Sequence, residues 1–436
     1  MSQLRSILFY ITVIDFSLLP MFHVYDIPFK IGFFIVGFCG VFKFYKNPCR
    51  PLFIIFYGLI LSCWIGALYQ HIFFYTPSYY FTLFCTTSYL LCFLSFCFGY
   101  HYSPDNFDLI FGIAIVVIFL NLIVGVFNDR IPFLIEYYNL QGPLGKGTME
   151  IRNAGIFENP NISALGINIL LLFITIANIL KLFHKDRIFV SLITFAIAFV
   201  AMLSLISKNQ LIAFTVLMVF YIAYLCFNMT KKHALTITFA AIIIVSIFNY
   251  STGNLVKKDV LRNGIYTATN LSREIYDQYF SPDINMNIYT DRRVKYLLAM
   301  KAFTFSPLLG SGFDRAESGI FSKNSKIGYH SDWSYLIVAG GVIGVVFFTL
   351  LLMRVWKAHP LLILPFFFPG LTNSFMLSVQ LFSLYGIFWG VIERKRNEKL
   401  MWLNFVKETS GGIIMEDENL KPENRSSGST LRPANV

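Results

Sequence analysis

The sequence predicts an all-α polytopic membrane protein with about twelve transmembrane helices and one large extracytoplasmic loop. Composition is the first reason: of 436 residues, 56% are hydrophobic, 18% are aromatic and only 14% are charged. Apolar runs of about 20 residues, the length that crosses a bilayer, recur along the chain. Lys and Arg residues gather in alternate loops between these runs. Such runs are too long and too frequent for one water-soluble core.

The expected spans follow the apolar runs in chain order. The first run, 6–22, comes after Arg5 and is not followed by a small-residue cleavage site, so we expect an uncleaved first helix. The last two runs are short and contain Pro360, Pro365 and Pro369, so we expect one of them to be kinked or re-entrant. The expected spans are residues 6–22, 29–45, 51–69, 79–100, 107–127, 161–180, 188–206, 210–228, 234–250, 333–352, 358–372 and 375–392.

Basic residues predict how the chain is oriented. The loops at 23–28 and 70–78 contain no Lys or Arg, whereas the alternate loops are rich in both. Because loops rich in Lys and Arg stay in the cytoplasm, we expect both termini to be cytoplasmic and residues 251–332 to be external. The basic residues assigned to the cytoplasmic side are Lys43, Lys46, Arg50, Lys181, Lys185, Arg187, Lys231, Lys232, Arg354, Lys357, Arg394, Lys395, Arg396 and Lys399.

The same patterns divide the chain into parts. After the last span, basic residues alternate with apolar ones, which is typical of a helix lying in the membrane interface. The final residues are polar and poor in aromatics, which predicts disorder. The expected parts are residues 1–250 with transmembrane helices 1–9 and an external loop at 128–160, a large external catalytic loop at 251–332, C-terminal spans at 333–392, an interfacial cytoplasmic segment at 393–410 and a disordered cytoplasmic tail at 411–436.

Several function classes are disfavoured by the sequence. The net charge of +11 comes largely from the loops, and no basic stripe with interleaved stacking aromatics indicates nucleic-acid binding. The seven cysteines lie in or beside expected spans and form no metal-binding spacing. No Walker loop, nucleophile elbow or Asp-x-Asp pair occurs. A bound diphosphate would therefore need Lys and Arg to neutralise it, and the guanidinium group matches phosphate oxygens well.

Two clusters on the expected outer face carry candidate binding residues. Asn161 stands at the start of a long apolar helix, whose N-terminus can attract an anion. The preceding loop is either a cap and positioning segment, or it brings Arg152 to a phosphate or sugar. Lys208 lies in a tight turn between two spans. It either extends to the membrane surface or faces inward as a charge partner.

The large external loop carries the remaining candidates. Arg292 and Arg293 lie in a segment, 291–303, whose apolar spacing predicts a helix, and the two arginines form either a solvated face or a binding surface. His330 lies at the mouth of a span beside Asp332. An imidazole there suits removal of a proton from a sugar hydroxyl, although an interfacial histidine without a chemical role fits equally well.

Five short motifs follow one another over about residues 150–345. Arg-x-x-Gly-Ile-Phe-x-Asn-Pro-Asn at 152–161 is followed by Leu-Ser-Leu-x-Ser-Lys at 203–208. An Arg and Pro-Leu-Leu-Gly-x-Gly follow across 292–312, and then come His-Ser-Asp-Trp and Gly-Gly-Val-Ile-Gly. This order of motifs resembles the bacterial O-antigen ligase and polysaccharide polymerase superfamily, and their placement on one membrane face makes the resemblance specific.

The resemblance implies a C-type membrane glycosyltransferase that uses undecaprenyl-diphosphate-linked glycans without a metal or cofactor. It implies that His330 is the catalytic base. In this sequence Lys208 stands where the family usually has Arg, which loses the bidentate guanidinium fork. The implied diphosphate contacts are Arg152, Lys208 and Arg292 or Arg293, and the implied sugar or supporting contacts are Asn159, Asn161 and Asp332.

The leading functional hypothesis is a metal-independent, inverting polymerase of lipid-linked oligosaccharide repeat units. It would act at the outer face of a bacterial inner membrane, in contact with the lipid bilayer and with a chain-length regulator protein as a further partner. One alternative is the ligase that transfers glycan to lipid A core. The other is a non-enzymatic transporter of lipid-linked oligosaccharides, which would place its charged site near mid-membrane rather than on one face.

Overall fold

A computed structural model of the protein describes the chain in ranges separated by gaps. These ranges fall into two compact units, Met1–Glu393 and Arg394–Val436, and each is described by itself. The described residues are 2–18, 22–24, 27–74, 79–127, 155–156, 160–183, 187–205, 207–227, 299–300, 302–312, 331–367, 375–376 and 378–417.

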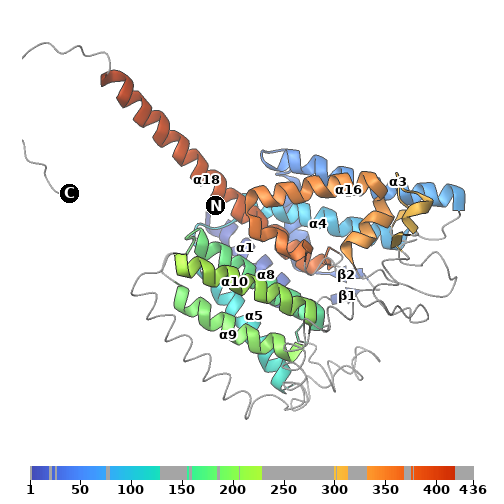
Figure 1. The fold of residues 1–436 in the computed structure, drawn as a ribbon, viewed down its shortest axis with the longest axis horizontal. Helices are drawn as coiled ribbons and strands as arrows, with labels where there is room; N and C mark the ends of the chain where they lie inside the picture. The colour runs from blue at the N-terminus through green and yellow to red at the C-terminus, as the bar shows by residue number, and fades with distance from the viewer. Residues whose placement is uncertain are drawn as a thin grey trace, which may run out of the picture. The chain divides into compact units, whose positions relative to one another are not determined.

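The described chain is built almost entirely from α-helices (Figure 1). A small antiparallel hairpin, in which Phe22 pairs with Phe29, is the departure from the all-α prediction and occupies the expected loop at 23–28. The elements are α1 (Ser2–Leu18), β1 (Phe22–Val24), β2 (Ile27–Phe29), α2 (Ile31–Val41), α3 (Cys49–Phe74), α4 (Tyr80–Tyr102), α5 (Asp108–Phe127), α8 (Pro160–Ile179), α9 (Ile188–Leu205), α10 (Lys208–Phe227), α16 (Asp332–Ala358), the 3-10 helix η1 (Pro360–Ile363) and α18 (Val379–Asp417).

Six of the described helices are long and apolar enough to cross a membrane. The candidate spans are Cys49–Ile72, Thr82–Tyr102, Asn161–Ile179, Ile188–Leu205, Gln210–Phe227 and Asp332–Ala358, and shorter apolar helices cover Ile31–Val41 and Asp108–Val124. The prediction of a helical, multi-pass membrane protein is therefore confirmed. The total of about twelve spans stays a prediction, and the expected span at 234–250 lies outside the described residues.

Some helix ends differ from the expected ones for local reasons. Helix α2 has 11 residues rather than the run expected at 29–45, because the chain turns at residues 42–48. In the expected span 358–372, Pro360 is the first residue of η1 and Pro365 lies in a helical stretch at 364–367, whereas Pro369 lies outside the described residues, so the expected kinked or re-entrant span stays a prediction. Helix α18 does not end near residue 392 but continues to Asp417. In its second part Glu398 pairs with Arg394 at 2.7 Å and with Lys395 at 2.9 Å, spacings that favour helix.

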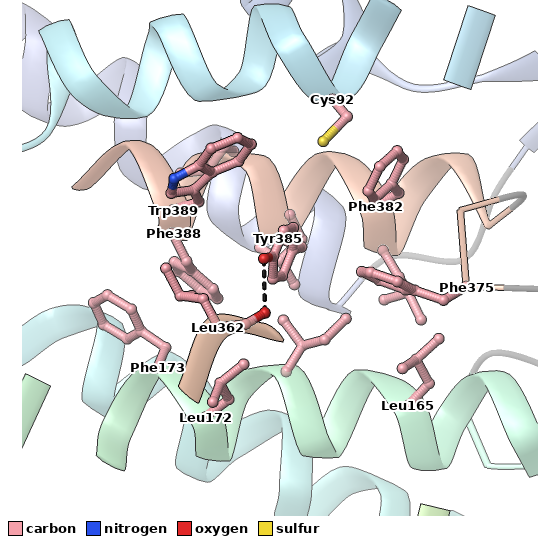
Figure 2. Close-up of a cluster of buried hydrophobic side chains, with 14 of the residues drawn as sticks. Cys92, Leu165, Leu172, Phe173, Leu362, Phe375, Phe382, Tyr385, Phe388 and Trp389 are labelled. Carbon is pink, nitrogen blue, oxygen red and sulfur yellow. Dashed lines mark hydrogen bonds between the residues drawn. The ribbon is translucent and has the colours of Figure 1, made fainter. Parts of the chain in front are cut away.

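Within the first unit, the helices pack as two neighbouring groups. Helix α3 contacts α16 along its length and also contacts α4, while α8 contacts α10 and α5 contacts α9 (Figure 1). The start of α18 lies in the buried core (Figure 2). There Phe388 stacks on Phe173 of α8 at 4.3 Å, and the Tyr385 hydroxyl donates a 2.8 Å hydrogen bond to the Leu362 carbonyl of η1. These contacts fix the start of α18 against both α8 and η1.

Candidate functional site

The structure describes only part of the predicted site. Lys208 is the first residue of α10, and its side chain lies outside the description. The side chains of Asn161 and Asp332 are described, and both make hydrogen bonds that connect segments far apart in the sequence. The predicted site residues that lie outside the described part of the chain are Arg152, Asn159, Arg292, Arg293 and His330.

Asn161 connects two of the sequence motifs. Helix α8 begins at Pro160, so Asn161 lies inside its first turn. The side-chain oxygen of Asn161 accepts a 2.8 Å hydrogen bond from the hydroxyl of Ser207. Ser207 directly precedes Lys208, so the turn that begins α10 is attached to the start of α8. The end of the 152–161 motif and the end of the 203–208 motif are thereby brought together.

The middle of the 152–161 motif is also anchored. The backbone N–H of Ile156 donates a 3.1 Å hydrogen bond to the side-chain oxygen of Asn121, a buried residue of α5. Gly155 has a φ of 69°, and a Cβ there would lie 2.5 Å from the hydroxyl oxygen of Ser163. Only glycine fits this approach without displacing α8. Arg152 therefore lies three residues from a backbone point held by α5 and α8.

A second polar contact joins α8 to α10 deeper in the bundle. The amide nitrogen of Asn168 donates to the Gln210 carbonyl at 2.8 Å and to the Gln210 side-chain oxygen at 2.9 Å, and both residues are buried. Asn168 also lines a cavity of about 20 Å³, which is room for about one water molecule. The other lining residues are apolar: Leu165, Ile169, Leu172, Ala213, Leu217, Leu364 and Pro365. This cavity is too small for a sugar or a diphosphate.

Asp332 is the first residue of α16, and its side chain binds the backbone of a distant segment. Its side chain is buried, and the carboxylate accepts hydrogen bonds from the backbone N–H groups of Phe375 at 3.0 Å and Met376 at 3.1 Å. The carbonyl of Met376 in turn accepts a 2.5 Å bond from the hydroxyl of Ser88 in α4. Asp332 therefore fixes where the chain enters α16, two residues after His330.

The Pro-Leu-Leu-Gly-x-Gly motif packs against the Gly-Gly-Val-Ile-Gly motif through the backbone. The N–H of Ser311 donates a 2.7 Å hydrogen bond to the carbonyl of Val338, and the N–H of Val342 donates a 2.9 Å bond to the carbonyl of Pro307. Four glycines permit this approach, and we call them the glycine junction: Gly66 of α3, Gly310, Gly312 and Gly341 of α16. A Cβ on Gly66 would lie 2.5 Å from the carbonyl oxygen of Ala339.

The structure thus brings some predicted residues together and leaves others untested. Asn161 is hydrogen-bonded to Ser207, the residue before Lys208. His330 and the predicted arginines lie outside the described residues, so the structure gives no distance from them to Asn161 or Lys208. Sequence reasoning missed Asn121, although an asparagine within the apolar run 107–127 is a usable signal of a buried polar contact. It also missed Ser207, whose partner is 46 residues away and leaves no local pattern.

Among the described residues, no group of three or more His, Cys, Asp or Glu side chains is placed to hold a metal ion. The fold defines a multi-pass helical membrane protein in which side-chain and backbone hydrogen bonds join the described parts of the motifs. No known protein-family model matches the chain, and no curated protein is significantly similar to it in sequence.

Proposed function

We propose that the protein is a polymerase of undecaprenyl-diphosphate-linked oligosaccharide repeat units, acting at the outer face of a bacterial inner membrane. The observation that supports this most directly is the hydrogen bond between Ser207 and Asn161. It connects two of the motifs on which the resemblance to the O-antigen ligase and polysaccharide polymerase superfamily rests. The proposal includes a C-type glycosyltransferase fold with about twelve spans, cytoplasmic termini and a chain-length regulator protein as a partner.

The proposed reaction is a direct displacement with inversion. A sugar hydroxyl of one lipid-linked repeat attacks C1 of the growing chain, and the bond between C1 and the diphosphate oxygen breaks. The hydroxyl proton passes to the imidazole of His330, since histidine is the side chain most often used as a general base. The leaving diphosphate keeps the bonding electron pair, and positive side chains stabilise its charge. Those proposed for this role are Arg152, Lys208 and Arg292 or Arg293.

The anchored motifs favour this arrangement because catalysis by fixed charges requires rigid supports. Arg152 is three residues from Gly155, which packs on Ser163, and Lys208 follows Ser207 directly. Both cations are therefore close in sequence to a residue that contacts the first turns of α8, Gly155 for Arg152 and Ser207 for Lys208. Asn159, Asn161 and Asp332 would support the site, Asp332 through its bonds to residues 375–376.

The test is polymerisation by the purified protein in liposomes that contain a defined lipid-linked repeat. We expect His330→Ala to lower the rate about 10²- to 10⁴-fold, the range for loss of a general base. Lys208→Ala should also lower the rate, and Lys208→Arg should restore it because the charge returns. Lys46→Ala, at an exposed turn residue between α2 and α3, is the matched control. Full-length polymer from a correctly inserted His330→Ala protein would refute the catalytic assignment.

Two further measurements separate the alternatives. In the host, a null mutant that carries single repeats on lipid A core indicates a polymerase, whereas bare core indicates a ligase. In liposomes, a transporter would move the lipid-linked oligosaccharide across the bilayer without forming a new glycosidic bond. Product length and substrate orientation, measured in the same preparation, therefore distinguish all three functions.

A further inference from the structure

The described residues 299–300 and 302–312 include a stretch, 307–311, that lies beside the interior of a candidate membrane span. Two helical pieces, at 299–300 and 302–305, lead into a turn at 306–309. Beyond the Ser311 and Val342 bonds described above, the N–H of Ile343 donates a 3.4 Å hydrogen bond to the carbonyl of Leu308. The hydroxyl of Ser311 also donates to the Val338 carbonyl, at 3.2 Å. The segment is thus attached to α16 between Val338 and Ile343.

This attachment lies well inside α16. Val338 and Ile343 come six and eleven residues after Asp332, which places them about 9 and 16 Å along the helix. With 27 residues, α16 is about 40 Å long, whereas the hydrocarbon core of a bilayer is about 30 Å thick. A centred α16 therefore reaches hydrocarbon about 5 Å from its first residue. The segment at 306–312 meets it beyond that point.

A break in α16 explains why the segment is held there. Gly341 has a φ of 58° and a ψ of −156°, outside the helical region, so the helix loses backbone hydrogen bonds at this position. Inside a membrane such bonds have to be replaced by protein groups, since no water is available. The backbone of residues 307–311 supplies the partners, and Gly66 lets α3 close over the same place. The segment and α16 therefore satisfy backbone hydrogen-bonding groups of each other at the break.

Most of the exposed side chains on the described part of the segment are apolar, and Thr304 is the polar exception. Met300, Phe305 and Leu308 are 53%, 50% and 59% exposed. This surface continues onto α16, where Val342 and Val346 are 44% and 52% exposed. The carbonyl of Leu308 bonds directly to the residue after Val342. At the depth of a membrane span, the medium that covers such side chains is hydrocarbon.

We propose that the described residues 299–300 and 302–312 belong to a re-entrant membrane segment whose exposed apolar side chains, Met300, Phe305 and Leu308, contact lipid acyl chains. This does not depend on the proposed function. It divides the loop expected at 251–332, because part of that loop belongs to the membrane-embedded bundle. It also limits where Arg293 can lie, since the six residues to Ala299 span at most about 20 Å.

The test uses single cysteines labelled with an environment-sensitive nitrobenzoxadiazole probe. Cys226 is exposed and is replaced by serine, while the other described cysteines are buried and do not compete for label. Leu308→Cys and Phe305→Cys report on the segment. Val346→Cys, on the exposed side of α16, is the lipid-facing control, and Lys46→Cys, at an exposed turn residue, is the aqueous control. Each labelled protein is reconstituted into phosphatidylcholine liposomes.

Quenching then identifies what covers the face. We expect nitroxide groups on the lipid acyl chains to quench the labels at Leu308 and Phe305 to within about twofold of the Val346 label. Iodide in the buffer should quench them several-fold less than the Lys46 label. Strong quenching by iodide with none by the lipid nitroxides would overturn the proposal, because the segment would lie in water. Protection from both quenchers would also overturn it, because a protein surface would then cover the face.

Discussion

The hydroxyl of Ser207 lies 2.8 Å from the side-chain oxygen of Asn161 and donates a hydrogen bond to it. The bond joins the turn before α10 to the first turn of α8. Asn168 and Gln210 repeat the connection farther along the same two helices. Because hydrogen bonds in an apolar surrounding are lost only at a cost, the two contacts hold α8 and α10 in one register. This register fixes the backbone from which the Lys208 side chain starts.

Replacing Ser207 tests this connection. We expect Ser207→Ala to lower the free energy of unfolding in detergent by about 1 kcal/mol, the usual contribution of one hydrogen bond. Ser207→Thr keeps the hydroxyl and should stay closer to wild type. Thr87→Ala is the control, because the Thr87 hydroxyl is exposed and its described bond is to the Leu83 carbonyl of its own helix. Equal stability of the Ser207→Ala and wild-type proteins would show that the bond contributes nothing.

Asp332 is predicted to stabilise the fold by binding the backbone of residues 375–376, a role that its position near His330 in the sequence does not suggest. Asp332→Ala leaves the buried N–H groups of Phe375 and Met376 without their acceptor, and each such loss costs about 1–3 kcal/mol. We expect a loss of about 2–6 kcal/mol in unfolding measurements, and a smaller loss for Asp332→Asn, which keeps one acceptor oxygen. Lys46→Ala, at an exposed turn residue, should be nearly neutral. A stable but inactive Asp332→Ala protein would instead indicate contact with substrate.

Run length and composition predicted the membrane class because they depend on local sequence alone. The break in α16 could not be predicted in the same way: Gly341 lies in an apolar run, 333–352, that reads as one continuous span. Its non-helical conformation depends on residues 307–311, which arrive from another part of the chain. Likewise, His330 stands only two positions before Asp332 in the motif, yet the described bonds of the carboxylate reach residues 43 and 44 positions away.

The glycine junction predicts unequal effects of the same substitution. We expect Gly341→Ala to destabilise the protein by about 1–3 kcal/mol, because its φ and ψ values lie in a region that essentially only glycine adopts. Gly310→Ala should be similarly harmful, since φ is 74° and a Cβ would lie 2.5 Å from the backbone nitrogen of Gly341. Gly112→Ala in α5 meets nothing within 4 Å and should be neutral or stabilising by about 0.5–1 kcal/mol. Thermal unfolding of the three variants in one detergent measures the difference, and similar losses at all three positions would contradict it.

His359 predicts how stability depends on pH. It follows α16, and burial lowers the pKa of its imidazole from 6.5 to about 4, because the charged form loses water. Its Nδ1 atom accepts a hydrogen bond from the N–H of Leu361 at 3.3 Å, which also requires the neutral ring.

A lowered pKa in the folded state means that the unfolded chain binds a proton more readily below pH 6.5. The contribution of His359 to stability is therefore complete above pH 6.5 and decreases as the pH falls toward 4. His359→Asn keeps an acceptor but does not titrate, so its melting temperature should fall less steeply over this interval. Melting temperatures measured from pH 7 to pH 4.5 in the same detergent give the comparison. If the melting temperatures of the two proteins fall in parallel, protonation of His359 does not cause the loss of stability at low pH.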